Sequence, residues 1–330
     1  MKRNVGRFLA DRKLLIILIV LIVLLSVVDR NFLSLETLIS LFDHVAINGI
    51  LAAGMTILLI SGSFDLSVGS VMALTGIVIV LTQRFGIAAS VILGLAAGTA
   101  VGALNGLLAV KGRINAFIVT LGTMTIFRGL GLAITSSHPV KGTIPAFAAF
   151  GQTALLGIPL PVFYLAIVYV AVWYVLKYTK FGRNDYAIGG NALSARLAGI
   201  PVDGYTFLYF VACSFAAALA GVVLTSRVNT GSAVFGDQTS MIVIAAAVLG
   251  GTSLNGGKGT VTGTIQGVLI FGLIERAMVV FNVDTNYQIL IRGLVIIAVV
   301  VADTVHRPTV ARDRDAGGGH GKAEKEVARA

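Results

Sequence analysis

Long apolar segments recur along almost the whole chain, and they constrain its fold more than any other feature of the sequence. Of the 330 residues, 56% are hydrophobic and only 12% are charged, whereas a soluble domain typically has about 25% charged residues. The apolar segments are continuous rather than alternating, which argues against a transmembrane β-barrel and for transmembrane helices. We therefore expect an all-α polytopic membrane protein.

A hydrocarbon core about 30 Å thick needs roughly 20 apolar residues in each helix that crosses it. The sequence accordingly predicts about ten transmembrane helices, which places both termini on the same side of the membrane. The predicted spans are 14–28, 45–61, 66–82, 86–110, 116–134, 161–177, 205–225, 241–255, 260–281 and 286–302. The chain would then consist of an N-terminal segment (1–13), a transmembrane domain (14–302) and a polar, disordered tail (303–330).

Basic residues are distributed unevenly between the two faces of this arrangement. Eighteen of the 25 lysines and arginines fall on the face that holds both termini, the loop at 178–204 and the loop around Lys258. Because cytoplasmic loops carry an excess of Lys and Arg, this face is predicted to be cytoplasmic. The same rule accounts for the formal net charge of +10, so we expect no nucleic-acid partner.

The loop at 178–204 is a substantial polar segment between two long apolar spans, and it is far longer than a simple connection requires. Residues 192–198 favour a short helix, with Asn191 as its N-cap and a Gly-Ile-Pro sequence after it. Leu193 and Leu197 lie four residues apart and would form an apolar edge beside Arg196. Such a helix suits a groove on a soluble partner, although a helix resting on the bilayer surface remains an alternative.

Two of the predicted spans are short and adjoin glycine-rich breaks, at 61–70 and 250–260. Paired broken segments are a sequence indication of a transport site near the membrane midplane. A shift of 190 residues aligns Ser63 with Ser253 and Gly69 with Gly259, which suggests an internal repeat. Both breaks fall on the same predicted face of the membrane, whereas an inverted repeat would put them on opposite faces. It would therefore require one span to be misassigned, and the repeat remains an open alternative.

A few polar residues within or beside the spans are candidates for the substrate pathway. Asp65 and Ser67 precede an apolar run, where a carboxylate is either functional or caps the helix that follows. Asn105, Thr120 and Thr123 lie inside two other spans, where hydroxyl groups commonly bond to their own helix backbone. Both the structural and the pathway interpretation remain open for these five residues.

The sequence carries no enzymatic signature. The segment 251–260 differs from a phosphate-binding loop at two required positions, Thr252 and Gly259. The four histidines are scattered without metal-ligand spacing, and the one cysteine, Cys213, excludes an intramolecular disulfide. We therefore predict no metal, no cofactor and no ATPase site in this chain.

Several motifs follow one another along the chain in a fixed order. They are Phe-Asp-Leu-Ser-Val-Gly-Ser at 64–70, Phe-Ile-Val-Thr-Leu-Gly-Thr-Met at 117–124, Tyr-Ala-Ile-Gly-Gly-Asn at 186–191, Ala-Arg-Leu-Ala-Gly-Ile at 195–200 and Ile-Ala-Ala-Ala-Val-Leu-Gly-Gly-Thr-Ser at 244–253. Together they resemble the membrane permeases of ribose-type ABC importers, which serve pentoses, hexoses and related small polyols. The resemblance extends from near residue 40 to residue 302.

This resemblance implies a transport subunit of the bacterial inner membrane with the helical fold of the vitamin B12 importer, the type II permease fold. It implies three kinds of partner: a cytosolic ABC ATPase, a periplasmic sugar-binding protein and a second permease, identical or related. The sugar-binding protein would dock at the outer loops around 135–160 and 226–240. The resemblance assigns the 178–204 loop to ATPase coupling, carried by Gly189, Gly190, Asn191, Ala195, Arg196 and Gly199.

Two positions depart from the family pattern. Ser240 and Met241 stand where the family often has Glu-Leu, and Asn115 and Ala116 stand where it tends to have prolines. Two other functions remain as alternatives, a branched-chain amino-acid ABC permease and an ion-coupled secondary transporter. The second of these would need an intramembrane carboxylate as a proton relay, for which Asp65 and Glu275 are the candidates.

Overall fold

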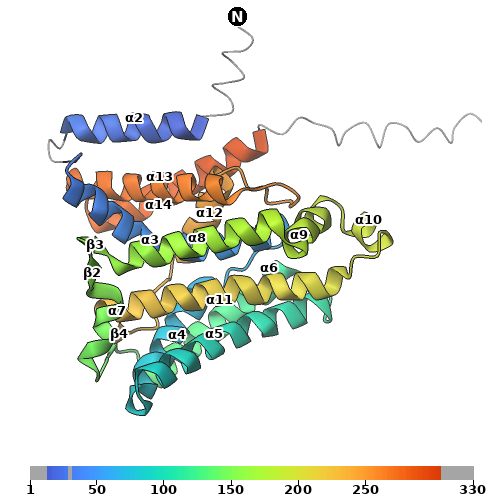
Figure 1. Ribbon diagram of the computed structural model, residues 1–330, viewed down its shortest axis with the longest axis horizontal. Coiled ribbons are helices and arrows are strands. Elements are labelled where there is room, and N and C mark those ends of the chain that lie inside the picture. Colours follow the sequence, from blue (N-terminus) through green and yellow to red (C-terminus); the bar gives the residue numbers. More distant parts are fainter. Residues whose placement is uncertain (1–12, 29–31, 306–330) are drawn as a thin grey trace, which may run out of the picture.

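The computed structural model describes residues 13–28 and 32–305. In this part of the chain, long helices run side by side in a bundle, and four two-residue strands lie near one end of it (Figure 1). The predicted all-α class is therefore confirmed. The N-terminal segment and the tail that the sequence predicts fall almost entirely on residues 1–12 and 306–330, outside the described residues.

The helices divide into long apolar helices and shorter ones. The long helices are α3 (Leu35–Ile60), α4 (Val68–Thr82), α5 (Ile87–Val110), α6 (Ala116–Ile134), α8 (Leu160–Tyr178), α11 (Val202–Val228) and α13 (Val261–Val280). The other helices, all shorter than these except α2 and α14, are α2 (Lys13–Val28), η1 (Gln83–Phe85), η2 (Pro145–Ala148), α7 (Ala149–Gln152), α9 (Lys180–Gly190), α10 (Ala192–Leu197), α12 (Thr239–Leu249) and α14 (Thr285–Val305). The strands are β1 (Val140–Lys141), β2 (Ala154–Leu155), β3 (Ile158–Pro159) and β4 (Thr230–Gly231).

Seven helical segments of the described chain are long and apolar enough to cross a membrane; they are the long helices named above, with α4 extended through η1. Three further apolar helices are shorter, over Leu14–Val28, Thr239–Leu249 and Thr285–Val301. Each of the ten predicted spans overlaps one of these ten helices. The protein is thus a multi-pass membrane protein, and the number of crossings beyond seven remains a prediction.

α3 and α4 form the centre of the bundle. Within the most apolar 18-residue stretch of each helix, 83% of the residues of α3 and 72% of those of α4 with η1 are buried, against 22% in α6 and 17% in α8. α6 and α8 therefore present most of their apolar side chains outward. In a membrane these faces contact lipid or another protein, because neither penalises exposed hydrocarbon.

Close packing around α4 depends on the glycines of α5, which recur every four residues. A Cβ on Gly98 would lie 2.5 Å from Thr75 Oγ1 of α4, and a Cβ on Gly102 would lie 2.8 Å from the Phe210 carbonyl oxygen of α11. Small residues at this spacing let helix backbones approach each other where lipid supplies no hydrophobic drive.

The observed helix bounds correct two predicted ones. α3 begins at Leu35 rather than at residue 45, because its charged residues are paired across the bundle: Asp43 forms an ion pair with Arg227 (2.7 Å) and His44 Nε2 lies 3.0 Å from Glu275. α12 ends at Leu249 rather than at residue 255. The Gly250–Gly251 pair ends the helix, and Gly251 has a positive φ of 89°.

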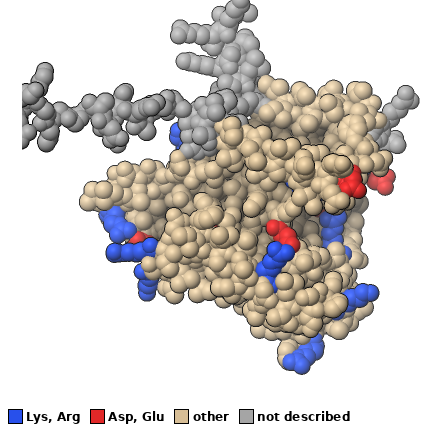
Figure 2. Space-filling view, turned by 180° about the vertical axis from the view of Figure 1, so that it is seen from behind, with Lys and Arg blue, Asp and Glu red and all other residues tan. Residues whose placement is uncertain are grey.

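The two ends of the bundle differ. α9 and α10 lie together at one end, and the four strands lie towards the other (Figure 1). Pairing of β1 with β4, with Val140 opposite Gly231, joins the two predicted outer loops into one structure. Figure 2 shows that Lys and Arg lie mostly towards the ends, while the broad middle is uncharged apart from a small cluster where acidic and basic atoms meet. This pattern fits a bundle whose middle is embedded in lipid.

Candidate functional site

A buried polar cluster lies immediately before α4. Asp65, Ser67 and Asn105 are all fully buried. Asp65 Oδ1 accepts hydrogen bonds from the backbone N–H of Ser67 (2.7 Å) and from its hydroxyl (2.6 Å), and Asn105 Nδ2 donates to Asp65 Oδ2 (3.1 Å) and to Ser67 Oγ (2.8 Å). A buried carboxyl is tolerated only when its oxygens are hydrogen-bonded in this way. Ser67 is the N-cap residue of α4, but its side chain makes no capping hydrogen bond to the helix, and Asp65 binds the N–H of Ser67 rather than one inside the helix.

The amide oxygen of Asn105 differs from the other groups of this cluster. It is buried and has no hydrogen-bond partner among the described residues. Buried acceptors are normally satisfied, so an unpaired one needs an explanation. It is an acceptor that a hydroxyl group could use if the surrounding helices separated.

Ser240 connects the start of α12 to the start of α4. Its hydroxyl donates to the Leu66 carbonyl oxygen (2.7 Å) and accepts from the Gly69 N–H (3.2 Å). The two short helices thus begin at the same place inside the protein and run towards opposite ends of the bundle. Sequence reasoning noticed Ser240 only as a departure from the family pattern, and its partners lie more than 170 residues away, beyond the reach of any local signal.

The remaining two pathway candidates lie on α6 and bond within it. Thr120 Oγ1 donates to the Ala116 carbonyl oxygen (2.8 Å) and Thr123 Oγ1 to that of Thr120 (3.2 Å). The structure therefore brings Asp65, Ser67 and Asn105 together but shows no hydrogen bond from either threonine to that cluster. Phe117 of α6 still reaches Phe64, with ring centroids 6.3 Å apart, so α6 lies beside the break that carries Asp65.

The predicted short helix of the 178–204 segment is present as α10, and Asn191 is its N-cap. Asn191 Oδ1 accepts a hydrogen bond from the Ser194 N–H (2.9 Å), and its extended backbone separates α9 from α10. Gly199 follows the helix with a φ of +83°, a conformation that favours glycine. Ile200 N–H then bonds back to the Ala195 carbonyl oxygen (3.0 Å), which closes the end of the helix.

α10 exposes an apolar edge at the end of the bundle. Leu193 and Leu197 are 69% and 82% exposed, while Ala195 is buried against the rest of the protein. Arg196 lies beside this edge and forms an ion pair with Asp203 at the start of α11. The edge is thus available to a partner or to the bilayer surface, as both interpretations of the sequence require.

The C-terminal end of α9 is locked against both glycine-rich breaks. A Cβ on Gly189 would overlap the Ile60 carbonyl oxygen and lie 2.5 Å from the Gly257 nitrogen. That same carbonyl accepts a hydrogen bond from Gly257 N–H (2.8 Å), and Gly256 packs on Gly62 and Gly189. Three segments distant in the sequence therefore meet backbone to backbone, which only glycine allows.

Two tyrosines hold α9 in place. Tyr186 Oη donates to the Gly259 carbonyl oxygen (2.9 Å), and Tyr209 Oη of α11 donates to that of Phe181 (3.1 Å). The rings of Phe181 and Tyr209 pack edge to face with centroids 4.7 Å apart. α9 is thus held both to α11 and to the break that precedes α13.

Sequence reasoning did not single out Asp185, which lies in the middle of α9. Its side chain is fully buried, and neither carboxyl oxygen has a hydrogen-bond partner among the described residues. Burial raises the pKa of this carboxyl to about 9, so Asp185 is neutral at physiological pH. Its neighbours in the chain are polar, so no local pattern indicates that it is buried.

Arg128 of α6 pairs with Asp237 (2.6 Å) in the segment before α12. This ion pair joins α6 to the segment that leads into α12. No group of three potential metal ligands lies together in the described part of the chain.

Comparisons with known proteins give the following results. The family model described as "Branched-chain amino acid transport system / permease component" matches residues 37–300. The ribose import permease protein RbsC of Haemophilus influenzae is 37% identical over 306 residues, covering 91% of this chain and 95% of that protein. RbsC of Bacillus subtilis is 39% identical over 290 residues (87% and 90%), and the L-arabinose transport system permease protein AraH of Escherichia coli is 37% identical over 306 residues (90% and 92%). No solved structure matches the chain.

Proposed function

The chain belongs to the branched-chain amino acid transport system / permease component family, and we propose that within this family it is the permease of an ABC importer for a monosaccharide or related small polyol. The observation that carries the proposal is the identity of 37–39% to ribose and arabinose permeases over about nine-tenths of both chains. The relatives are permeases, which are transport subunits rather than enzymes. The family description names branched-chain amino acids, but these relatives make a sugar the favoured substrate.

An ABC permease works with a separate ATPase and a substrate-binding protein. The exposed leucines and Arg196 of α10 offer an apolar edge with a positive charge, which suits a groove on a cytosolic ATPase. The outer loops joined by β1 and β4 offer the surface for a periplasmic sugar-binding protein. These assignments make α9 and α10 the cytoplasmic end.

The proposed topology follows from these partners. With α2, α12 and α14 added to the seven long helices, the chain has ten membrane segments, both termini cytoplasmic, and the type II fold of the vitamin B12 importer. The predominance of Lys and Arg at the α9–α10 face supports this orientation in the inner membrane. The outward apolar surfaces of α5 and α6, whose apolar windows are only 28% and 22% buried, leave room for lipid and for a second permease, identical or related.

Coupling would proceed from α10 to the helix starts inside the protein. When ATP closes the ATPase pair, the two α10 helices of the assembled transporter move together. α9 follows, because Asn191 joins the two helices, and Gly189 carries the movement to the breaks at Ile60 and Gly257. The break after Ile60 leads directly into Asp65 and α4, so force reaches the buried polar cluster.

The buried cluster is the proposed gate of the substrate pathway. Asp65, Ser67 and Asn105 satisfy one another, and Ser240 holds α12 against the same point. Separating α12 from α4 would free the Ser240 hydroxyl and expose the unpaired Asn105 oxygen, which are groups that bind sugar hydroxyls. Thr120 and Thr123 on the neighbouring α6 would line the path once it opens.

Sugar uptake by the reconstituted transporter tests this function. Proteoliposomes that contain the permease and its ATPase should accumulate labelled ribose or arabinose when the binding protein is added. ATP is supplied on the side of the membrane that carries the ATPase. Excess leucine should not compete. Uptake that follows a proton gradient without the ATPase would favour a secondary transporter, and uptake of leucine instead of sugar would favour an amino-acid permease.

A further inference from the structure

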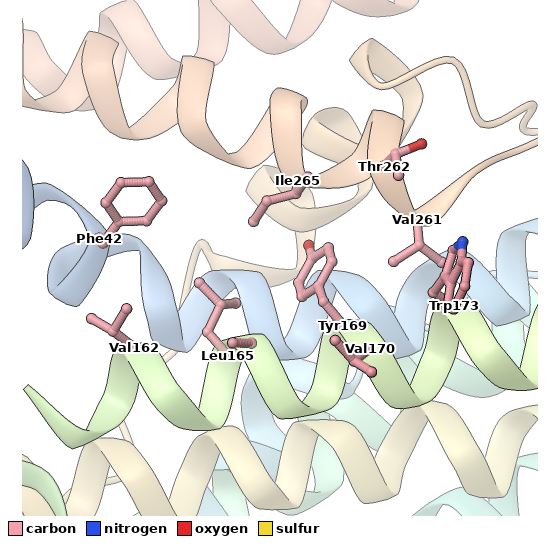
Figure 3. Close-up of a pocket in the computed structure, with 10 residues that line it drawn as sticks. Phe42, Val162, Leu165, Tyr169, Val170, Trp173, Val261, Thr262 and Ile265 are labelled. Atoms are coloured by element: carbon pink, nitrogen blue, oxygen red, sulfur yellow. The ribbon is translucent and has the colours of Figure 1, made fainter.

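An apolar groove runs along the outside of the bundle between α8 and α13. It encloses about 480 Å³, and the side chains of the two helices point towards each other across it, with Tyr169 reaching from α8 towards Ile265 of α13 (Figure 3). Its length along α8, from Val162 to Trp173, is about 16 Å at the helical rise. That length matches one leaflet, which is half of a hydrocarbon core about 30 Å thick.

The end of the groove nearest α9 opens into a second, basic cavity of about 420 Å³. Trp173, Val261 and Thr262 line both spaces, so the two are continuous. Lys177 and Arg183 line the second cavity, and neither is within ion-pair distance of a carboxylate among the described residues. The Lys177 ammonium lies over the Trp173 ring, 5.0 Å from its centroid, which keeps this charge at the mouth of the groove.

The groove also contains a polar atom without a partner. The hydroxyl of Tyr169 is buried and has no hydrogen-bond partner among the described residues. Leaving a buried hydroxyl unsatisfied costs free energy that a ligand acceptor would recover. An apolar channel as long as one leaflet, an unsatisfied donor within it and two cations at its end form a complementary set.

We propose that this composite site binds one anionic phospholipid, with an acyl chain in the α8–α13 groove, an ester carbonyl accepting from Tyr169 and the phosphate between Lys177 and Arg183. Basic recesses between transmembrane helices commonly hold the headgroups of anionic lipids. The site adjoins α9, since Arg183 and Tyr186 of that helix line its basic end. A bound lipid would therefore brace the helix that carries α10.

Native mass spectrometry of the purified full-length permease tests this site. The protein is titrated with phosphatidylglycerol or with phosphatidylcholine of identical acyl chains. We expect the wild-type protein to retain phosphatidylglycerol more tightly. The double variant Lys177→Gln/Arg183→Gln should bind it about thirtyfold more weakly, since two phosphate contacts are lost. Lys180→Gln is the matched control, because Lys180 is exposed on α9 and does not line the site.

Ala166→Trp provides a second, uncharged test, because residue 166 lines the groove and a tryptophan there would fill it. This variant should lose the tightly bound lipid while keeping its thermal midpoint. Equal phosphatidylglycerol binding by the double variant and by Lys180→Gln would overturn the proposal, as would equal binding of the two lipids by the wild type. If Ala166→Trp binds phosphatidylglycerol as the wild type does but no longer forms a permease dimer, the groove contacts a second permease subunit. That result would also overturn the lipid site.

Discussion

Replacing Gly189 with alanine tests whether the end of α9 is locked against the two backbone breaks. An added Cβ would overlap the Ile60 carbonyl oxygen and lie 2.5 Å from the Gly257 nitrogen, whereas real Cβ contacts essentially never fall below 3.0 Å. Both neighbours are backbone atoms, so no side chain can rotate away to make room. α9 must therefore separate from the breaks.

The energetic cost of that separation has two parts. Loss of the Gly257 N–H to Ile60 carbonyl hydrogen bond, 2.8 Å long, leaves backbone groups unsatisfied at a cost of about 1–3 kcal/mol. Strain from the added methyl group costs a further 1–3 kcal/mol, roughly. We expect Gly189→Ala to lower the free energy of unfolding by about 2–6 kcal/mol and the thermal midpoint by about 5 °C or more.

Gly190→Ala is the matched control for this experiment. It lies on the same helix end, and nothing lies within 4 Å of a Cβ built there. The assay is thermal unfolding of both full-length variants in the same detergent, followed by circular dichroism. If both variants melt at the wild-type temperature, α9 is not locked against the breaks and the coupling route described above is wrong.

Three further predictions concern other parts of the molecule. Asn105→Ala removes the donor to Asp65 and Ser67 and should lower the free energy of unfolding by about 2–4 kcal/mol. The control Thr125→Val, on the exposed side of α6, should leave the thermal midpoint unchanged. Similar midpoints for the two variants would contradict the stabilising role of the cluster. Gly102→Val should destabilise the protein, because the added side chain would collide with the Phe210 carbonyl oxygen. Gly122→Val is the control, since nothing lies within 4 Å of a Cβ built there. Equal thermal midpoints for these two variants would show that α5 is not tightly packed on α11. Because burial raises the pKa of Asp185 from 3.8 to about 9, the folded protein keeps a proton that the unfolded chain releases between these values. The free energy of unfolding should fall as pH rises through that window, by up to about 1.4 kcal/mol per pH unit. Asp185→Asn should flatten this fall, and parallel pH profiles of the thermal midpoint for the two proteins would contradict the assignment.

Apolar length alone was enough to locate the helices, because a segment of this composition has no alternative to the helix in lipid. It could not locate all their ends. The start of α3 was missed because Glu36, Asp43 and His44 interrupt the apolar run. The helix continues through Asp43 and His44, which pair with Arg227 and Glu275, two residues far away in the sequence.

Local capping rules worked where the signal was local. Asn191 and Gly199 delimit α10 as predicted, because each acts on backbone groups a few residues away. α9 was read as loop, since its eleven residues include three glycines and several polar side chains. What stabilises it is packing of Gly189 on Ile60 and of Tyr186 on Gly259, and neither contact can be inferred from the segment itself.

The buried cluster shows the same limit. Asp65, Ser67 and Asn105 were all candidates from their polarity inside apolar surroundings. Their convergence depends on a contact across 40 residues, which one sequence does not reveal. Thr120 and Thr123 had the same sequence signature, yet they satisfy their hydroxyls within α6.

We propose that a separate ATPase drives transport through α10, and a charge exchange at Arg196 would show whether the ATPase touches this helix. The measurement is ATP-dependent sugar uptake by the reconstituted complete transporter, with Arg196→Glu and with the double exchange Arg196→Glu/Asp203→Arg. The double exchange restores the ion pair within the segment but not the positive charge at residue 196. We predict that both variants insert and fold but fail to transport; normal uptake by Arg196→Glu, or recovery of uptake in the double exchange, would contradict a direct contact between Arg196 and the ATPase.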